Sequence, residues 1–416
     1  MAFLRRIWNR DDGQALAACT ALDIGTEFAK ALVLEIDHQG HGTVRGVGRK
    51  RQGLSHMQSG TVADIAAVVD NCSIALQEAE EMAGFRPTQV VVGIAGELVK
   101  GFTTTLTQER KKPELPISDA ELVKLIDGVQ RQALLEAERS ITWETGLPHV
   151  DVRLVHAAIV GASIDGYGLS NPVGFQGRHV KIGIFNAFAP LVHLGALQSV
   201  ASQLDLQLLE VVAEPYAFAR VLGTEQVRQA GALFIDVGGG TTDVALVRGG
   251  GIAGTKMLAL GGRAFTKGLA ERLGLAFADA EAAKLAVASE ERAGVADALL
   301  EDARIWRSGV ELMIGDLAGG ELLPGRILLC GGGADLPQVR AVLDEDGWWN
   351  RLPFARRPKI RALAPDEVVG LRDATGALGT RQDVTPMALA HQALILDAGA
   401  SAVDRAMRGV VREMAL

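Results

Sequence analysis

The chain has 416 residues, 48% of them hydrophobic, and a formal net charge of −8 with a sequence pI near 5.6. This length predicts about two or three domains with buried cores, and the acidic balance argues against a nucleic-acid partner. Cys19, Cys72 and Cys330 are too few and too scattered for a disulfide framework or a cysteine metal site. The sequence also contains no apolar run of about eighteen residues that could span a membrane.

The first ten residues predict a short basic amphipathic helix. Their large apolar side chains recur at helical spacing, and Arg5, Arg6 and Arg10 stand beside them. The apolar set is Phe3, Leu4, Ile7 and Trp8. Such side chains can sink below lipid headgroups while arginines meet anionic lipid, so this segment is a candidate membrane anchor.

The next segment places an acid and a glycine turn between two strand-like runs. Asp23 stands near the end of the first run, Gly25 and Thr26 form the turn, and a second apolar run follows. Apolar residues then recur every three or four positions over 62–83, which predicts a helix, and 89–94 has the pattern of a buried strand. The start of the chain is therefore predicted to be βββαβ.

A helix and two strands are predicted in the stretch that follows. Ser118, with Glu121 three residues later, predicts a capping box for a helix that ends near Arg139. Strands predicted at 152–159 and 180–188 flank a polar, glycine-rich stretch.

Residues 231–247 form the most informative segment. Asp236 lies at the end of one apolar run, Gly238, Gly239 and Gly240 form a turn, and a second apolar run follows. Glycines let main-chain N–H groups approach an anion, and the aspartate can hold a hydrated Mg²⁺ beside the same phosphates. Because the chain continues as a strand and not as a helix, a P-loop and a dinucleotide fingerprint are excluded.

Beyond this hairpin the pattern is helical until a third glycine turn. Helices are predicted over 264–273, 278–286 and 290–317, and the turn of Gly331, Gly332 and Gly333 precedes another helical stretch. One glycine-rich turn between strands is common, but three in one chain favour a shared ligand. Two acid-bearing hairpins can clamp phosphates from both sides, while the third turn lies beside a base or ribose.

These motifs together resemble the actin-like ATPase superfamily and, within it, the bacterial cell-division family FtsA. The three turns and the acid Glu214, which precedes Pro215, carry the superfamily resemblance. The stretch 164–166 and the stretch from Asn171 to Gly177 resemble the small subdomain 1C that separates FtsA from actin. The resemblance covers roughly residues 17–390.

The resemblance implies an α/β chain with the actin-like ATPase fold. In that fold two duplicated ribonuclease-H-like halves enclose a cleft, and an FtsA-type 1C subdomain, which is SHS2-like, is inserted in the first half. The implied parts are an N-terminal basic amphipathic segment (1–16), subdomain 1A (17–99 and 185–224, completed by 376–416), subdomain 1C (100–184), subdomain 2A (225–262 and 305–375) and a reduced subdomain 2B (263–304).

The resemblance also implies ATP and Mg²⁺ as cofactors and gives roles to individual residues. Asp23 and Asp236 would hold Mg²⁺ through water, and Glu214 would orient the attacking water. The phosphates would lie among Gly25, Thr26, Gly238, Gly239, Gly240, Thr241 and Thr242, and the adenosine beside Gly331, Gly332 and Gly333. Glu281 and Lys284 would contact ribose, although their spacing of three residues on a helix favours by itself a surface ion pair.

Two departures from the FtsA pattern change the expected chemistry. FtsA proteins usually continue the first turn with a hydroxyl residue and a lysine, whereas Glu27 and Phe28 here add a negative charge and remove a positive one. We therefore expect ATP binding with slow hydrolysis at most. Between Lys284 and Arg304 a short helix-like stretch stands where FtsA carries the 2B strands that grasp FtsZ, so FtsZ binding stays open.

The C-terminal end carries a second amphipathic candidate. FtsA proteins bind the membrane through a C-terminal helix after a flexible linker, and this chain has a stripe without such a linker. The apolar stripe is Val403, Met407, Val410, Val411 and Met414, opposite Arg405, Arg408 and Arg412. A stripe of this kind more often docks on its own domain.

The leading hypothesis is an ATP-binding division scaffold that forms protofilaments. It would bind peripherally to the inner face of the cytoplasmic membrane and recruit division proteins, with FtsZ as a candidate among them. A PilM-like ATPase of type IV pilus assembly is an alternative, compatible with the short basic N-terminus and the missing 2B strands. A small-metabolite kinase is a third, but we find no catalytic aspartate outside the phosphate turns.

Overall fold

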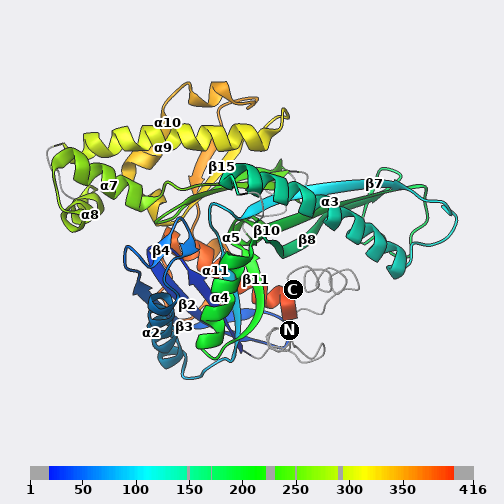
Figure 1. The fold of residues 1–416 in the computed structure, drawn as a ribbon, viewed down its shortest axis with the longest axis horizontal. Helices are drawn as coiled ribbons and strands as arrows, with labels where there is room; N and C mark the ends of the chain where they lie inside the picture. The colour runs from blue at the N-terminus through cyan, green and yellow to red at the C-terminus, as the bar shows by residue number, and fades with distance from the viewer. Residues whose placement is uncertain are drawn as a thin grey trace.

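The computed structural model describes residues 18–147, 150–169, 171–221, 230–248, 251–288 and 294–397. They form two large sheets (Figure 1). One hydrophobic core runs from the first sheet onto one face of the second, and another lies on the opposite face of the second sheet. The mixed α/β architecture that the sequence predicted is confirmed. Among the described helices, none has the length and apolar content needed to cross a membrane.

The first sheet has six strands in the order β11-β6-β1-β2-β3-β17. Strands β1, β2 and β3 pair antiparallel in sequence, and β6 and β11 add in parallel, which agrees with the predicted βββαβ start. The strands are β1 (Ala18–Ile24), β2 (Phe28–Ile36), β3 (Gly42–Arg51), β6 (Gln89–Ile94), β11 (Gln207–Ala213) and β17 (Leu371–Asp373). A small separate hairpin consists of β4 (Met57–Gln58) and β5 (Thr61–Val62).

Four helices pack with this sheet, and together they are called the first body. They are α2 (Ile65–Ala83), α4 (Leu191–Gln203), α5 (Glu214–Val221) and α11 (Val384–Asp397). Helix α2 lies directly on β3 because two glycines there leave room for its backbone. A Cβ at Gly46 or Gly48 would come within 1.8 Å of the carbonyl oxygen of Ala79 or Ala75, respectively.

The second sheet has nine strands in the order β16-β15-β12-β13-β14-β7-β10-β8-β9. Its first five strands and their helices are called the second body. The strands are β12 (Ala232–Val237), β13 (Thr242–Arg248), β14 (Gly251–Leu258), β15 (Arg326–Cys330) and β16 (Lys359–Ala362). The helices are α7 (Gly262–Leu273), α8 (Phe277–Ala286), α9 (Val295–Ala318) and α10 (Pro337–Asp344), with the short η1 (Gly332–Asp335) and η2 (Trp348–Arg351).

The remaining four strands of the nine-stranded sheet and helix α3 are called the insertion. They are β7 (Lys100–Glu109), β8 (Val152–Ile164), β9 (Tyr167–Leu169), β10 (His179–Pro190) and α3 (Asp119–Thr145). The insertion projects to the right in Figure 1. Its β7 pairs with β14 at Gly254 and Phe102, so its sheet continues that of the second body, which the sequence did not suggest.

Helix α3 is capped as predicted at its start and is longer than predicted. The Ser118 hydroxyl accepts a hydrogen bond from the Glu121 N–H, but the Glu121 carboxylate binds Arg110 and does not close a capping box. The helix continues to Thr145 and ends at Gly146, whose φ of 67° lies in the left-handed region. The predicted end near Arg139 was therefore too early.

The predicted subdomain boundaries stay a prediction. Strand β10 crosses the boundary placed at 184/185, and α9 crosses the one at 304/305.

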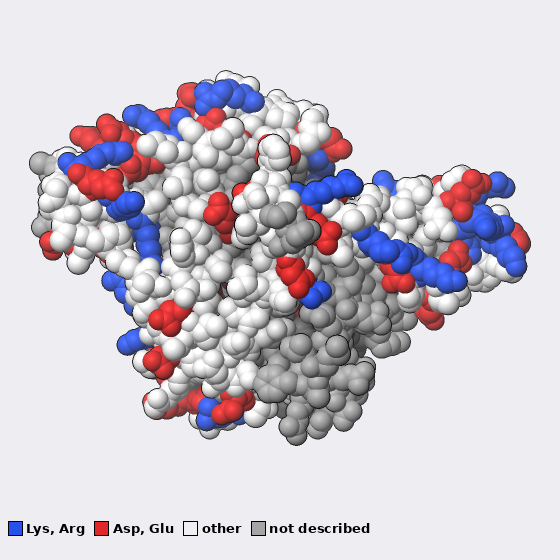
Figure 2. Space-filling model, in the orientation of Figure 1, with Lys and Arg blue, Asp and Glu red and all other residues white. Residues whose placement is uncertain are grey.

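Figure 2 shows basic and acidic side chains interspersed over the insertion and over the second body. On the face in view, neither sign of charge covers a broad continuous area.

Candidate functional site

The first glycine turn joins β1 to β2 and presents Asp23 beside a lysine. The Gly25 N–H donates to the Phe28 carbonyl over 3.1 Å, which closes the turn. Asp23 is 4% exposed, and Lys30, its partner across the strand pair, donates to its carboxylate over 3.0 Å. Lys30 also donates to the Gln382 carbonyl in the short helix η4 (Arg381–Asp383), just before α11. A positive charge thus stands near the position where Phe28 replaced the expected lysine.

The second turn joins β12 to β13 and touches the first. The Gly238 N–H donates to the Thr241 carbonyl over 2.9 Å. A Cβ at Gly239 would lie 2.7 Å from the Glu27 Cβ, and one at Gly240 would lie 2.6 Å from the Thr26 hydroxyl oxygen. Only glycine fits this close approach of the two bodies.

The third turn follows β15 and passes over the end of β12. Gly331 has a φ of +81°, and a Cβ there would lie 2.1 Å from the Asp236 Oδ1. A Cβ at Gly333 would lie 2.4 Å from the Val237 side chain. The three turns that the sequence singled out therefore converge at one place, because β12 and β15 are parallel neighbours and β12 begins the second hairpin.

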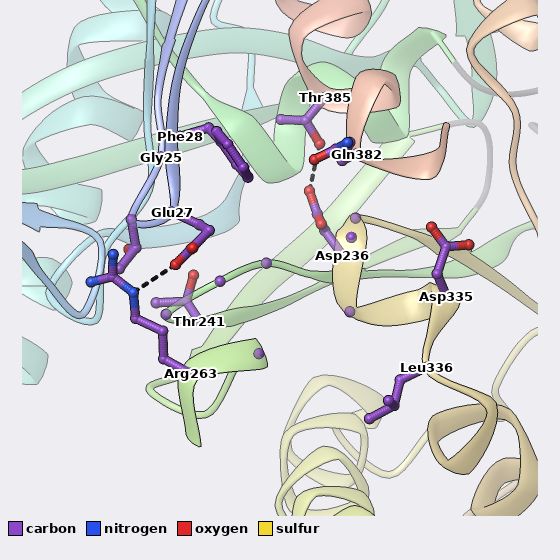
Figure 3. Close-up of a pocket in the computed structure, with 18 of the residues that line it drawn as sticks. Gly25, Glu27, Phe28, Asp236, Thr241, Arg263, Asp335, Leu336, Gln382 and Thr385 are labelled. Carbon is purple, nitrogen blue, oxygen red and sulfur yellow. Dashed lines mark hydrogen bonds and ion pairs between the residues drawn. The ribbon is translucent and has the colours of Figure 1, made fainter. Parts of the chain in front are cut away.

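A cavity of about 460 Å³ opens between the two bodies at this point (Figure 3). Its lining includes most of the predicted site residues: Asp23, Gly25, Thr26, Glu214, Asp236, Gly238, Gly239, Gly240, Thr241, Glu281, Lys284, Gly331, Gly332 and Gly333. Figure 3 shows Asp236 and Thr385, which comes from α11, directed toward each other. The first and second bodies thus both contribute polar groups to the cavity.

Thr242 is the predicted phosphate residue that does not line this cavity. Its side chain is fully buried, its hydroxyl donates to the Leu260 carbonyl over 2.6 Å, and it accepts a bond from the Trp306 indole N–H over 2.8 Å. Because side chains alternate along a strand, Thr242 points into the core when Thr241 faces the cavity. The Thr242 side chain is therefore bound within the core, and the expected place of this residue beside the phosphates stays a prediction.

Among the carboxylates that line the cavity, four form a cluster whose charges act on one another: Asp23, Glu214, Asp236 and Asp243. The sequence found the first three. The fourth, Asp243, is paired across the hairpin with Asp236 and is 5% exposed. The hairpin register could have revealed it, since the two aspartates flank the glycine turn symmetrically. Burial, followed by the charge of Asp236, raises the pKa of Asp243 well above its usual range.

The same environment acts on the other acids. Burial, and then the charges of Asp23, Asp243 and Asp236, raise the pKa of Glu214 well above its usual range. Burial also raises the pKa of Asp236, although a hydrogen bond from Thr385 and the charge of Lys30 oppose this effect. Carboxylates that repel one another in a buried site favour protons or a cation.

The donor set fits a hydrated divalent cation. In the part of the chain that the structure describes, no group of three or more His, Cys, Asp or Glu side chains is arranged to hold a metal ion. The Asp243 Oδ1 is nevertheless buried and has no hydrogen-bond partner among the described residues, and Asp23 and Asp236 line the cavity beside the glycine turns. Hard carboxylate oxygens near phosphate-binding turns suit Mg²⁺, which usually keeps several of its waters.

Glu281 and Lys284 form a largely buried pair at the cavity wall. The Lys284 ammonium lies 2.8 Å from the Glu281 carboxylate and donates to the Gly262 carbonyl and the Thr266 hydroxyl. Burial acts to raise the pKa of Glu281, but hydrogen bonds from Lys284 and Thr266 lower it. The spacing argument for a surface ion pair therefore does not hold, since both side chains are only 10–12% exposed.

Glu27 does not leave an uncompensated negative charge in the cavity. Its carboxylate accepts hydrogen bonds from Arg51 over 2.6 Å and from Arg263 over 2.8 Å (Figure 3 draws the second). The expected added charge is thus neutralised by two arginines that sequence reasoning missed. They lie 24 and 236 residues away from Glu27, and no local pattern connects them.

The candidate membrane segments lie outside the described residues. This applies to Phe3, Leu4, Ile7 and Trp8 at the N-terminus and to the stripe from Val403 to Met414.

Comparison with known proteins gives matches to one cell-division family. A family model described as cell division protein FtsA matches residues 233–354, which contain the second and third turns. The FtsA of Pseudomonas aeruginosa is 26% identical over 254 residues, which cover 61% of this chain and 56% of that protein. The FtsA of Streptococcus pneumoniae is 27% identical over 388 residues, which cover 86% of this chain and 80% of that protein. The chain thus spans little more than half the length of the Pseudomonas relative.

A solved structure supports the fold. A PilM–PilN type IV pilus biogenesis complex matches with a TM-score of 0.63 and 17% identity, covering 92% of this chain and 99% of that one. A likeness at this identity shows the fold alone. That fold is the actin-like ATPase fold which the sequence predicted. Taken together, the sequence matches and this fold support the resemblance of the chain to a divergent FtsA.

Proposed function

We propose that this chain is an ATP-binding cell-division scaffold of the FtsA type. The observation that carries the proposal is the convergence of three glycine turns and a cluster of four carboxylates on one cavity between two bodies, in a chain that matches a cell-division family model. A ligand that contacts both bodies favours the conformation in which they are close. Bound nucleotide would therefore favour one closed conformation, and head-to-tail assembly would depend on it.

The phosphates would be held by main-chain N–H groups of the first two turns other than those of Gly25 and Gly238, which close the turns themselves. Gly25 and Thr26 come from the first body, and Gly238 to Thr241 come from the second, and the two turns pack against each other at the cavity. Bound Mg²⁺ would supply positive charge for the phosphates and for the acids. Asp23 and Asp236 would hold its water ligands, with Lys284 and Glu281 beside the ribose and the third turn beside the adenosine.

Hydrolysis is proposed to be slow. Glu214 would orient the attacking water, but burial and the neighbouring charges raise its pKa and favour its protonated form. The protonated form cannot accept a proton from the water until a cation relieves the repulsion among the acids. Lys30, which would offset phosphate charge, is already bound to Asp23 and the Gln382 carbonyl. The site therefore suits prolonged binding of nucleotide more than rapid turnover.

Substitution of Asp236 tests this proposal. We expect Asp236→Ala to weaken ATP binding in calorimetry by at least about tenfold and to abolish ATP-dependent sedimentation, because it removes a ligand of the hydrated cation. Asp70→Ala, an exposed aspartate on α2, is the matched control and should behave as the wild type. Full ATP affinity and assembly in Asp236→Ala would refute the proposal.

Peripheral membrane binding is a separate part of the proposal. The basic apolar segment of residues 1–10 would lie at the inner face of the cytoplasmic membrane. Liposome sedimentation with and without ATP, comparing the full chain with a chain lacking residues 1–12, tests it. Equal binding of both chains to anionic liposomes would contradict this anchor and leave the C-terminal stripe as the candidate.

The division partner is tested by direct binding. The described residues between 263 and 304 contain α7, α8 and the start of α9, with no strand among them. This differs from the strand-bearing 2B surface by which FtsA proteins are expected to grasp FtsZ. Measured affinity for an FtsZ tail peptide would show that the helical surface replaces the strands.

A PilM-like role in pilus assembly is the second candidate. The match to the PilM–PilN complex over 92% of this chain and the helical 263–304 region favour it. Affinity purification of the tagged chain from its own cells separates the two candidates. Recovery of pilus-assembly proteins without division proteins would support the second.

A further inference from the structure

Arg263 joins the second body to the first through its entire guanidinium group. It is the second residue of α7, yet all the hydrogen bonds that its guanidinium makes within the described chain go to the first body. Its Nε donates to the Glu27 carboxylate over 2.8 Å, and its Nη atoms donate to the carbonyl oxygens of Gln52, Gly53 and Leu54 over 3.3–3.4 Å. The side chain is 15% exposed, so water competes weakly for these contacts.

Glu27 extends this contact into a chain of alternating charges. It binds Arg51 of the first body as well as Arg263 of the second, and Arg51 lies 3.6 Å from the Glu281 carboxylate in α8. The order Arg263, Glu27, Arg51 and Glu281 therefore crosses between the two bodies twice. All four side chains line the 460 Å³ cavity.

The contact of Arg263 with Glu27 is separate from a second contact between the two bodies. Thr385 of α11 donates to Asp236 in a separate part of the cavity, as Figure 3 shows. Thr385 and Asp236 lie among the acids, whereas Glu27 and Arg263 lie where Gly239 packs against the first turn. If the bodies separate, Arg263 loses its carboxylate and its three carbonyl acceptors together.

We propose that Glu27 and Arg263 form a clasp that holds the two bodies together over the cavity and slows exchange of its ligand. The inference deepens, and rests on, the proposal that the cavity takes a magnesium-bound adenine nucleotide. It also gives a physical reason for a glutamate in a phosphate-binding turn. The Glu27 carboxylate binds two arginines, so it links the two bodies and its charge is neutralised instead of repelling phosphate.

The rate of nucleotide release measures how far the clasp slows exchange of the ligand. A fluorescent ADP analogue is bound with Mg²⁺ and chased with excess ATP, using wild type, Glu27→Gln, Arg263→Gln and the double variant. We expect each single variant to release the analogue about tenfold faster, which is the effect of one partly buried charge-assisted contact. The double variant should be no more than about threefold faster than either single variant, because both changes remove the same contact.

A control and a second readout separate the clasp from general destabilisation. Glu35→Gln removes a carboxylate from the half-exposed pair with Arg45, 2.7 Å apart, and should release the analogue at the wild-type rate. In the ligand-free chain, we expect both clasp variants to take up deuterium faster in peptides spanning 52–56 and 262–266. Melting temperatures should stay close to that of the wild type.

The two readouts also distinguish failure of the clasp from failure of the proposed function. Wild-type release rates and unchanged deuterium uptake in Glu27→Gln would overturn the clasp, as would an effect of Arg263→Gln that Glu27→Gln does not share. If the wild type binds no adenine nucleotide, the proposed function fails, and deuterium uptake alone still decides whether the two residues hold the bodies together.

Discussion

Asp243 tests the electrostatics of the acid cluster. Its side chain is 5% exposed, its Oδ1 has no hydrogen-bond partner among the described residues, and its Oδ2 accepts a 3.3 Å bond from Thr241. Because burial and the charge of Asp236 raise its pKa, the folded chain holds a proton there that the unfolded chain releases above about pH 4. The stability of the ligand-free chain should therefore fall as the pH rises from about 5 to 8.

Asp243→Asn removes the charge and keeps the shape of the side chain. We expect the free energy of unfolding of the ligand-free chain at pH 8 to rise by about 1–3 kcal/mol, the usual penalty for a poorly satisfied buried group. For a chain of this length the increase corresponds to a melting temperature about 1–3 °C higher. Thermal denaturation at pH 5, 6.5 and 8, with chelator and without nucleotide, measures both the increase and a flatter dependence on pH.

Asp383 is the matched control, because it is equally buried but well paired. Its carboxylate binds Arg49 and accepts hydrogen bonds from the N–H groups of Gly379 and Thr380. Asp383→Asn should therefore lower the free energy of unfolding by about 1.5–3 kcal/mol. Destabilisation of Asp243→Asn at pH 8, or an unchanged slope with pH, would refute the reasoning about the cluster.

Three further substitutions test individual contacts. Gly93→Ala would place a methyl group 2.6 Å from the Glu214 Oε1 and so displace this carboxyl. Phosphate-release assays should show ATP hydrolysis at least about tenfold slower than in the wild type, with ATP affinity within about threefold of it. Thr242→Val leaves the Trp306 N–H without its acceptor and should lower the free energy of unfolding, measured by denaturant titration, by about 1–3 kcal/mol. Weaker nucleotide binding with an unchanged free energy of unfolding would contradict a structural role of Thr242. Gly331→Ala adds a side chain at a φ of +81° and 2.1 Å from the Asp236 Oδ1, so calorimetry should show at least about tenfold weaker ATP binding, and wild-type affinity would remove the third turn from the site.

The predicted glycine turns and acids were recognisable because they are local features. An aspartate near the end of a strand, a run of small residues and a second strand specify a tight hairpin within about ten residues, as in 236–242. The expected ligand, and the expectation that the turns act together on it, came from the resemblance to FtsA, because spacing alone does not give them. Glu281 and Lys284 show the limit of such local patterns. Their spacing predicted an ion pair on the surface, whereas in the structure the pair is largely buried and Lys284 donates to Thr266.

The amino-acid sequence by itself determined which backbone segments can approach an anion, because that property depends on glycine and on strand periodicity over a few residues. Only the tertiary structure decided how the charges around them are compensated. The charge of Glu27 is offset by Arg263 from 236 residues away, whereas one oxygen of Asp243 has no partner in the part of the chain that the structure describes, although Asp243 belongs to the same hairpin as Asp236. Electrostatic compensation depends on distance and burial in space, and the order of residues along the chain fixes neither.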